Sequence, residues 1–597
     1  TLVLLAVFVP VGFMPGITGQ LYRQFAVTIC TAVVISAINA LTLSPALCAV
    51  LLREPKVIRR GPLSWFNRTL EFTRNVYVAS TAWLIRRLFV ALFIFVGVLG
   101  VGYFLFTRTP SSFLPPEDQG AFFINAQLPE GASIVRTSRV MQQVTRTLKD
   151  IDGVEDVLGI SGFSLLSGTA ENVAFGIIPL KPWDERTRPD QKLDAIVGKA
   201  MDRLAAISSA NIFAFVPPPI MGLGVTGGFD FQLQALEDQS PREIAAAATS
   251  LVIAANQEPT LMRVFSTYKA NTPQIFVNLD RTRAETLKVP VSRVFATLQA
   301  QLGSGYVNDF NLYGQVYQVK VQAEASYRDA VDDINRLYVR SNDGKMVPIK
   351  SLVTLSTVLS PPLIYRYNQF ASVQINGNAA PGFSSGDAMA AMERLAARTL
   401  PKGYAFEWSS MSFQERQAEG KVVYLFALAL LFGYLFLVGQ YESWNIPLSI
   451  VLSIPVASVG GLFGLWIVGL DLSIYAQIGL VLLVGLAAKN AILIVEFSKD
   501  RRKEGFPPAK AAVEGAKIRF RPVLMTAFTF IMGVAPMVIA TGAGAGSRRA
   551  IGTTVFAGML AATLVGIFLI PPLYYTFQSF REKGSAWRDR RRGKGAS

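Results

Sequence analysis

A lysine inside an apolar stretch is the first residue in this sequence whose type and position suggest chemistry. Lys489, followed directly by Asn490, lies within Leu472–Phe497, which is long enough to cross a bilayer as one helix. A bare ammonium in hydrocarbon costs about 2.5–3.5 kcal/mol. The alternative explanation is that the Lys489 side chain extends to the lipid headgroups. Glu496 lies roughly 10 Å further along such a helix, which disfavours this alternative. The position predicts a paired intramembrane charge that titrates or changes partner, as in proton-coupled transport.

The charge distribution points to a membrane rather than to nucleic acid. The 597 residues are 51% apolar and carry a formal net charge of +16. Residues 108–418 hold 29 basic and 30 acidic side chains, so the whole excess lies outside them, in the hydrophobic parts. A positive-inside bias has this form. The composition predicts a membrane protein with a large polar domain and no nucleic acid partner.

The sequence contains few residues that could bind a metal ion or a cofactor. The sequence has no histidine and two cysteines, Cys30 and Cys48. They are roughly 27 Å apart if helical, too far for a disulfide with each other. Neither a His- or Cys-based metal centre nor a cofactor is predicted. An enzyme is the least favoured class, because no nucleophile–base pair is recognisable.

Hydropathy and basic loops predict how the elements lie about the membrane. Alternating the apolar segments puts the basic clusters on one side, expected to be cytoplasmic, and the domain 108–418 on the other. Residues 62–80 are predicted to form an amphipathic helix on the inner surface, with a plain linker as the alternative. The apolar segments are 1–14, 24–52, 88–107, 421–440, 445–470, 472–497, 522–541 and 550–578.

The polar domain alternates strand and helix patterns, which suggests α+β subdomains of split βαβ topology. A GxGxxG spelling at 222–227 is rejected as a dinucleotide site, because it opens a strand where such a site needs a helix. The expected strands are 121–128, 154–160, 173–180, 211–216, 229–235, 274–279, 363–377 and 404–408. The expected helices are 132–150, 190–206, 241–257 and 384–399.

The first and last membrane segments overlay without a gap, which indicates an internal repeat. The chain is therefore expected to begin near the end of one unit and to continue through a second, with most of the first half missing. The seven matching pairs, all offset by 526, are Pro10 and Pro536, Gly16 and Gly542, Arg23 and Arg549, Thr28 and Thr554, Leu43 and Leu569, Pro45 and Pro571, and Leu47 and Leu573.

Five motifs carry a family resemblance: GLAAKNAILIVEFSKD (485–500), RFRPVLMTAF (519–528), TGAGAGSRRAIGT (541–553), LYRQFAVTI (21–29) and SGYVNDFNLYGQVYQV (304–319). Over essentially its whole length the chain resembles the resistance–nodulation–division superfamily, specifically the hydrophobe/amphiphile branch of multidrug efflux pumps. The resemblance implies an α-helical transmembrane bundle and a large periplasmic α+β domain of split βαβ (ferredoxin-like) porter subdomains and a docking subdomain.

The resemblance also implies a division of the chain. The expected parts are membrane helices five (truncated) and six in 1–52, a cytoplasmic amphipathic helix and linker in 53–87, helix seven in 88–107, a porter subdomain in 108–238, a second porter subdomain in 239–286 and 362–412, a docking subdomain in 287–361, helices eight to twelve in 421–578 and a basic cytoplasmic tail in 579–597.

By resemblance, a proton relay is assigned to Lys489, Asn490, Thr526 and Arg519. In the family such a relay includes paired aspartates on a helix that would lie upstream of Thr1. The chain alone is therefore expected not to pump.

The resemblance places substrate contacts in the polar domain. Phe163 and Leu165 match a gating loop, Ile160 and Ile177 a deeper pocket, and Phe229 and Phe231 an access pocket. Ordinary strand core remains the alternative for each of these residues.

The function implied is proton-motive-force-driven export of small hydrophobic or amphiphilic compounds. The protein would be a homotrimer in the lipid bilayer of a bacterial inner membrane, working with a periplasmic adaptor protein and an outer-membrane channel. A heavy-metal exporter of the same superfamily and a non-transporting receptor or scaffold remain alternatives. The first lacks soft ligands other than scattered methionines, and Lys489 argues against the second unless it only fixes packing.

Overall fold

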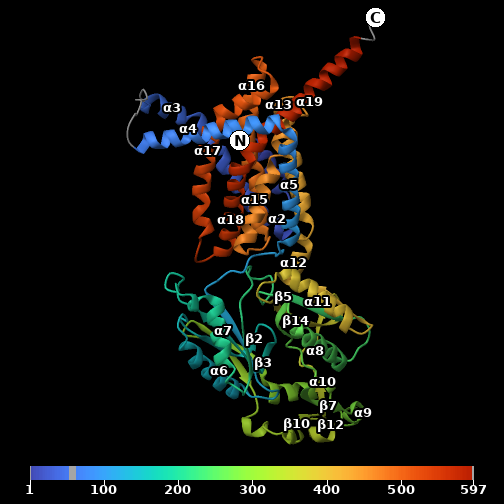
Figure 1. The fold of residues 1–597 in the computed structure, drawn as a ribbon. Coiled ribbons are helices and arrows are strands. Elements are labelled where there is room, and N and C mark those ends of the chain that lie inside the picture. The colour runs from blue at the N-terminus through green and yellow to red at the C-terminus, as the bar shows by residue number, and fades with distance from the viewer. Residues whose placement is uncertain (1, 53–61, 594–597) are drawn as a thin grey trace.

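The computed structural model describes residues 2–52 and 62–593, which form a helix bundle joined to a sheet-rich outer part (Figure 1). Within these residues seven helical stretches are long and apolar enough to cross a membrane, and the apolar helix at the start is shorter. Residue 1, part of the predicted linker (53–61) and the end of the predicted tail (594–597) lie outside the described residues.

The bundle places the apolar segments of the sequence side by side, as their composition predicts. Its helices are α1 (Leu2–Val11), α2 (Gly16–Leu41), α3 (Leu43–Leu51), α4 (Pro62–Arg86), α5 (Leu88–Arg108), α13 (Lys421–Tyr441), α14 (Ile446–Val451), α15 (Ile454–Val468), α16 (Ile474–Lys503), α17 (Pro508–Val538), α18 (Ala545–Ala561), a π-helical turn (Ala562–Gly566) and α19 (Ile567–Gly593).

Helix α16 lies deepest in the bundle. Of its apolar span 78% is buried, against 6% for Gly16–Leu51. Small residues let neighbouring backbones approach closely: a Cβ on Gly558 of α18 would lie 2.2 Å from Leu483 Cδ1 of α16. The helix that carries Lys489 is therefore positioned by close packing against α18.

The predicted amphipathic segment is a helix, α4, which lies across one end of the bundle (Figure 1). Tyr77 is buried on its inner face, stacked on Phe520 at 4.8 Å, and its hydroxyl donates to the Ile567 carbonyl oxygen at 3.1 Å. The side of α4 that carries Tyr77 is thus covered by α17 and α19, whereas Trp65, Phe66 and Phe72 are exposed. Its location on a membrane surface remains a prediction.

The first sheet of the outer part has two helices on one face. Its strand order is β2-β3-β1-β4 and its pairs are antiparallel. Apolar residues of β1 and the helices, among them Ile124, Val144, Leu148 and Ile196, form the core between them. The elements are β1 (Ala121–Gln127), α6 (Ile134–Lys149), β2 (Leu158–Ser164), β3 (Gly168–Pro179), a 3-10 turn (Pro189–Gln191), α7 (Leu193–Leu204) and β4 (Asn211–Phe215).

The second sheet also has two helices, α8 and α11, on one face. Its strand order is β13-β14-β5-β15, and β6 also pairs with β14. Both helices begin with capping boxes, Ser240 with Glu243 and Ser384 with Asp387. The elements are β5 (Phe229–Ala235), α8 (Pro241–Gln257), β6 (Leu261–Phe265), β13 (Tyr365–Tyr367), β14 (Phe370–Ala379), α11 (Ser385–Thr399), β15 (Tyr404–Trp408) and α12 (Ser410–Ala418).

Strand pairing corrects two predicted boundaries. The first subdomain was expected to end at 238, but β5 pairs with β14 and β15 and so belongs to the second sheet. The second was expected to include 239–286, but β7 (Thr272–Leu279) pairs with β12 (Val353–Ser360) of the third unit. Backbone hydrogen bonds to distant strands, which local patterns do not reveal, decide both cases.

The third unit lies at the far end of the outer part (Figure 1). Its small core includes Ala284, Val294, Ile334 and Leu352. Besides β7 and β12 it contains α9 (Arg281–Thr286), α10 (Val291–Leu298), a π-helical turn (Gln299–Ser304), β8 (Gly305–Leu312), β9 (Gln315–Val321), β10 (Tyr338–Arg340), β11 (Met346–Pro348) and 3-10 turns at Ala325–Tyr327, Val331–Arg336 and Ile349–Ser351.

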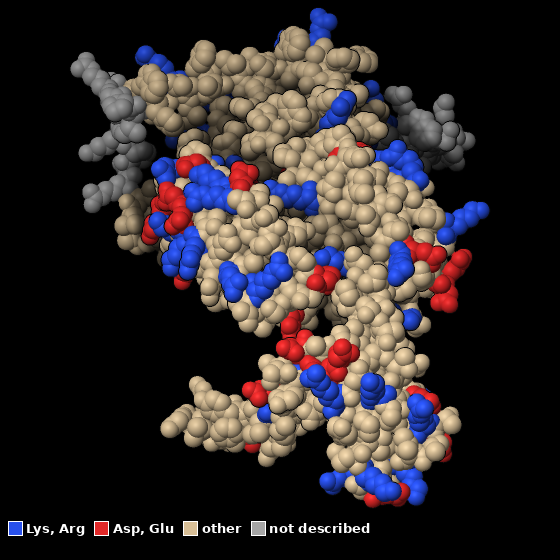
Figure 2. All heavy atoms as spheres, turned by 90° about the horizontal axis from the view of Figure 1, so that it is seen from below, with Lys and Arg blue, Asp and Glu red and all other residues tan. Residues whose placement is uncertain are grey.

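The outer part carries both signs of charge. Figure 2, seen from the end opposite the bundle, shows Lys and Arg interspersed with Asp and Glu on this surface. This agrees with the near balance of 29 basic and 30 acidic residues in 108–418.

Candidate functional site

Lys489 opens into a groove between α16 and α17. Its side chain is exposed, although its helix is the most buried of the bundle. The groove has a volume of about 630 Å³ and is lined by Lys489, Met525, Thr526, Thr529, Phe530, Gly533 and Val534. The Thr526 hydroxyl donates to the Pro522 carbonyl at 2.9 Å, which leaves its oxygen free to accept a hydrogen bond. The ammonium of Lys489 therefore shares one opening with the hydroxyls of Thr526 and Thr529, and the other lining residues are apolar or glycine.

Asn490 and Arg519 lie outside this groove lining. Asn490 is 2% exposed, and neither its amide nitrogen nor its amide oxygen has a hydrogen-bond partner among the described residues. The Arg519 guanidinium lies 3.4 Å from the centre of the Phe497 ring. It is two turns from Thr526, or roughly 10 Å along α17. Of the four predicted relay residues, the structure thus brings Lys489 and Thr526 together.

A second candidate site lies on the face of the first sheet that its helices leave uncovered. Phe123 is opposite both Ile177 and Phe215, and Asn125 is opposite both Phe175 and Phe213. Directly opposite residues share a face of a sheet, and the alternate residues Ile124 and Ala126 face α6 and α7. We call this surface the aromatic face; it comprises Phe123, Phe175, Phe213, Phe215, Ile160 and Ile177.

Four predicted substrate residues lie on or beside the aromatic face. Ile160 is opposite Phe175 in the ladder, and Ile177 is half-buried. Phe163 lies beyond a bulge in β2, with its ring 6.3 Å from that of Phe175 and 36% of the residue exposed. Leu165 is exposed in the turn that follows. Ile160, Phe163 and Leu165 are exposed, whereas Phe123, Phe175 and Phe215 form a small buried cluster. An exposed apolar edge of this kind can bind amphiphiles by area and fit.

The remaining two predicted substrate residues lie elsewhere. Phe229 and Phe231 are 3% and 0% exposed in the core beneath the second sheet. The Phe231 ring stacks on Phe406 at 4.9 Å and meets Trp408 edge-on at 5.3 Å. Their phase along β5 turns them toward α8 and α11, so they are strand core, the alternative that the sequence left open.

Sequence reasoning missed five aromatic residues at this site: Phe123, Phe175, Phe213, Phe215 and Phe265. The available signal was the alternation within Ala121–Gln127, which separates Phe122 and Ile124 from Phe123 and Asn125. Alternation separates two faces but does not say which one the helices cover.

The second unit closes one side of the aromatic face. The rings of Phe213 on β4 and Phe265 on β6 are 4.5 Å apart. Nearby, the Lys269 ammonium pairs with the Glu130 carboxylate at 3.2 Å. The aromatic face therefore borders a contact between the two units.

The corresponding face of the second sheet is polar. Asp230 is 0% exposed, and its Oδ1 accepts hydrogen bonds from Gln374 Nε2, at 2.8 Å, and from Asn376. Burial raises the pKa of the Asp230 carboxyl, and these hydrogen bonds only partly oppose that effect. The Ser409 amide donates to the Asp230 carbonyl at 3.1 Å, which ties β5 to α12 and so to the start of α13.

Comparison with known proteins gives a consistent result over the length of the chain. The family model described as the AcrB/AcrD/AcrF family matches residues 1–578. The chain is 40% identical over 581 residues to the multidrug export protein AcrF of Escherichia coli (strain K12), covering 96% of this chain and 56% of the relative.

Two further relatives agree. The multidrug resistance protein MdtF of Escherichia coli O157:H7 is 39% identical over 96% of this chain and 56% of its own length. The toluene efflux pump membrane transporter TtgB of Pseudomonas putida (strain DOT-T1E) is 38% identical over 97% of this chain and 55% of its own. The chain thus spans a little over half the length of these curated relatives.

Proposed function

The chain belongs to the AcrB/AcrD/AcrF family, and from this premise we propose that it is the C-terminal part of a proton-driven exporter of hydrophobic and amphiphilic compounds. The names of its relatives, which describe multidrug export, multidrug resistance and toluene efflux, support this substrate class.

The observation that carries the proposal is the groove shared by Lys489 and Thr526. An ammonium at this depth is costly unless an opposite charge faces it. When partner carboxylates from another segment are ionised, the ammonium neutralises them; when they bind protons, the attraction weakens and the lysine can move. Such a change in charge biases the packing of α16 against its neighbours.

Asn490 and Arg519 have supporting roles in this proposal. A buried amide without hydrogen bonds is unfavourable. Asn490 is therefore expected to contact a polar group of the proposed upstream half. Arg519 is held against Phe497 and lies closer than Thr526 to the proposed cytoplasmic end of α17. It is expected to place a positive charge at the cytoplasmic mouth of the proton path.

The partner carboxylates are proposed to lie in an upstream half of the same protein. The chain covers a little over half of its relatives' length, and its first and last membrane segments repeat with an offset of 526. Both facts support an intact protein of two similar units, of which this chain holds the second.

The aromatic face is proposed as part of the substrate path, with Phe163 and Leu165 as a gate and Ile160 and Ile177 as pocket wall. Each of the first two sheets would be a split βαβ porter subdomain, which their strand orders and one-sided helices support. The porter units are then residues 109–215 for the first sheet, and 229–265 with 365–408 for the second. The docking subdomain comprises 272–360.

The assembly is proposed to be a homotrimer in a bacterial inner membrane, with the outer part in the periplasm. A periplasmic adaptor protein and an outer-membrane channel would complete the export path. The basic loops beside α4 and α17 and the balanced charge of the outer part support this orientation.

Lys489→Met in the full-length protein tests the mechanism. We expect loss of dye efflux from cells lacking other multidrug pumps, with normal amounts of protein in the membrane. Lys499→Met is the matched control, because Lys499 lies on the same helix but packs on the Tyr441 ring at 4.8 Å, toward the end of α16; it should retain efflux. Wild-type efflux by Lys489→Met would rule the mechanism out.

A second experiment tests the proposed missing half. Residues 1–597 expressed alone should not exclude the dye, whereas co-expression with the upstream half should restore exclusion that collapses with an uncoupler. Uncoupler-sensitive exclusion by residues 1–597 alone would contradict the proposal.

A further inference from the structure

The segment between α5 and β1, residues 109–120, contacts both the bundle and the first sheet through consecutive carboxylates. Glu117 reaches the start of α18: its carboxylate accepts hydrogen bonds from the Gly546 amide at 3.1 Å, the Ser547 amide at 2.7 Å and the Ser547 hydroxyl at 2.5 Å. These are unpaired first-turn donors of a helix, where a negative charge is favourable.

The start of α18 is shaped for this contact. Its N-cap, Gly544, has φ +65° and provides no side-chain cap. A Cβ on Gly546 would lie 2.7 Å from the Pro116 carbonyl oxygen, so only glycine allows this approach of the segment. The first turn of α18 is therefore capped by a residue more than 400 positions earlier in the sequence.

Asp118 makes the opposite connection, to the first sheet. Its carboxylate pairs bidentately with Arg186, at 3.0 and 3.2 Å, and the Arg186 side chain is 1% exposed. The Trp183 indole nitrogen donates to the Asp118 carbonyl at 3.2 Å. A planar, bidentate ion pair of a buried arginine has one well-defined geometry.

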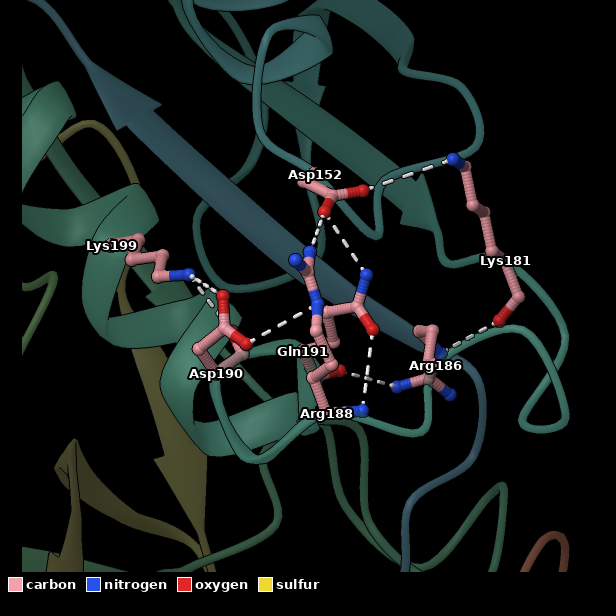
Figure 3. A network of polar contacts seen from close by, with 7 residues as sticks. All are labelled: Asp152, Lys181, Arg186, Arg188, Asp190, Gln191 and Lys199. Carbon is pink, nitrogen blue, oxygen red and sulfur yellow. Dashed lines mark hydrogen bonds and ion pairs between the residues drawn. The ribbon is translucent and has the colours of Figure 1, made fainter.

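The loop that carries Arg186 is itself braced. Arg186 donates to the carbonyl oxygens of Lys181, at 2.7 Å, and Gln191. Figure 3 shows the surrounding network, in which Asp152 receives contacts from Lys181, Arg188 and Gln191, while Asp190 pairs with Lys199 at 3.0 Å. Since this loop joins β3 to α7, the Asp118–Arg186 pair connects residues 109–120 to the first sheet.

The same segment is attached to the helix that carries Lys489. The Leu472 amide donates to the Pro110 carbonyl at 2.8 Å, and the Ile474 amide to that of Phe113 at 3.1 Å. Helices α16 and α18 also interlock further in, where Gly479 lies against Thr554. Hydrogen bonds therefore connect residues 109–120 to the starts of α16 and α18 at three places.

We propose that residues 109–120 form a coupling strut, in which Glu117 takes up displacement of α18 and Asp118 passes it through Arg186 to the first sheet. Glu117 and Asp118 act in this proposal as positioning residues: they hold the start of α18 and Arg186, and take no part in proton transfer or substrate binding. This inference rests on the proposed function, since it supplies a route from the Lys489 groove to the aromatic face.

A double-mutant cycle on efflux tests the strut in the full-length protein. Glu117→Ala and Asp118→Ala should each lower efflux roughly 2- to 30-fold. Because two links in series fail as one, the double variant should be no worse than the more damaging single variant. Two losses that multiply would show independent structural roles and overturn the proposal, as would wild-type efflux by either single variant.

The matched control is Glu185→Gln, which removes an exposed carboxylate from the same loop as Arg186 and should leave efflux unchanged. If Glu117→Ala does not fold, Glu117→Gln replaces it, since it keeps one acceptor oxygen but removes the charge.

A distance measurement separates coupling from stability. Spin labels at the exposed positions Arg549 on α18 and Gln142 on α6 report the relative position of the bundle and the first sheet. In the wild type the distance should be narrowly distributed in both acidic and alkaline buffer; in Glu117→Ala it should broaden while the protein remains folded. An unchanged distribution would overturn the strut.

The strut and the proposed function can fail separately. Wild-type efflux by Lys489→Met contradicts the proton mechanism, and the double-mutant cycle still decides the strut. Loss of efflux by Lys489→Met together with multiplicative effects at Glu117 and Asp118 contradicts the strut alone.

Discussion

The first and second sheets share one architecture but use their aromatic residues in opposite ways. Each places two helices on one face. In β1 the phase that faces away from the helices carries Phe123, and the residues on the same face of the neighbouring strands include Phe175, Phe213 and Phe215. In β5 the aromatic residues take the covered phase, and the other phase carries Asp230, Gln232 and Gln234.

A one-residue difference in phase therefore separates a sheet whose aromatic residues face away from its helices from one whose aromatic residues pack beneath them. Successive side chains of a strand point to opposite faces, so AFFINAQ and FDFQLQA place their phenylalanines differently although both are rich in them. The polar face of the second sheet ties β5 to α12 and the bundle, whereas the aromatic face of the first borders the second unit through Phe213 and Phe265.

The largest difference between the sheets should appear when a buried ring is removed. Phe231→Ala should lower the free energy of unfolding by about 3–5 kcal/mol, because it leaves a cavity between Phe406 and Trp408. Denaturant unfolding followed by tryptophan fluorescence measures this. A loss below about 1 kcal/mol would mean that Phe231 is not core, and the contrast with Phe163 would disappear.

The polar face of the second sheet should make stability depend on pH. The Asp230 pKa is raised by burial, so above the unfolded value of about 3.9 the native state keeps a proton that the unfolded chain has lost. Stability should fall as pH rises from there through the folded pKa. Asp230→Asn should flatten this slope in thermal unfolding measured across pH.

Asp238→Asn, an exposed carboxyl change in the same unit, is the control and should leave the slope as it is. On the first sheet, the buried polar residue on the face away from the helices is the amide Asn125. Its contribution to stability should therefore not depend on pH. An unaltered slope in Asp230→Asn would show that Asp230 is ionised in the native state.

The smallest effect on stability, and the most selective effect on transport, is expected at Phe163. Because 36% of this residue is exposed, Phe163→Ala should cost about 1–2 kcal/mol of stability, less than Phe231→Ala. Efflux of bulky amphiphiles should fall roughly 2- to 10-fold, as loss of one aromatic contact implies, and efflux of small ones should change less. Equal loss for every compound would indicate a general packing defect.

Much of the fold could be predicted from the sequence, where local pattern decides. The helix expected over 132–150 spans Ile134–Lys149, the strand expected over 404–408 has those bounds, and 62–80 is helical within Pro62–Arg86. The strand expected over 154–160 instead spans Leu158–Ser164. Its register is set by pairing with β3, and Val154 forms only an isolated bridge to Leu180.

The candidate site divides along the same line. Lys489 could be singled out because the cost of an ammonium in an apolar span depends on that span alone. Its shared groove with Thr526 depends on how α16 and α17 pack, and the strut depends on Glu117 meeting a helix more than 400 residues away. No local pattern records such contacts.

The sequence by itself determined the membrane spans, the position of a lysine inside one of them, the balanced charge of the outer part and most strand and helix positions. These follow from transfer free energies and side-chain periodicity, which sum over neighbouring residues. Only the tertiary structure decided that Phe229 and Phe231 pack beneath the helices of the second sheet, while Phe123 and Phe175 form a small buried cluster on the face of the first sheet that its helices leave uncovered. Alternation defines two faces of a strand, but helices from elsewhere in the chain cover one of them, and that choice belongs to the packing of the whole unit.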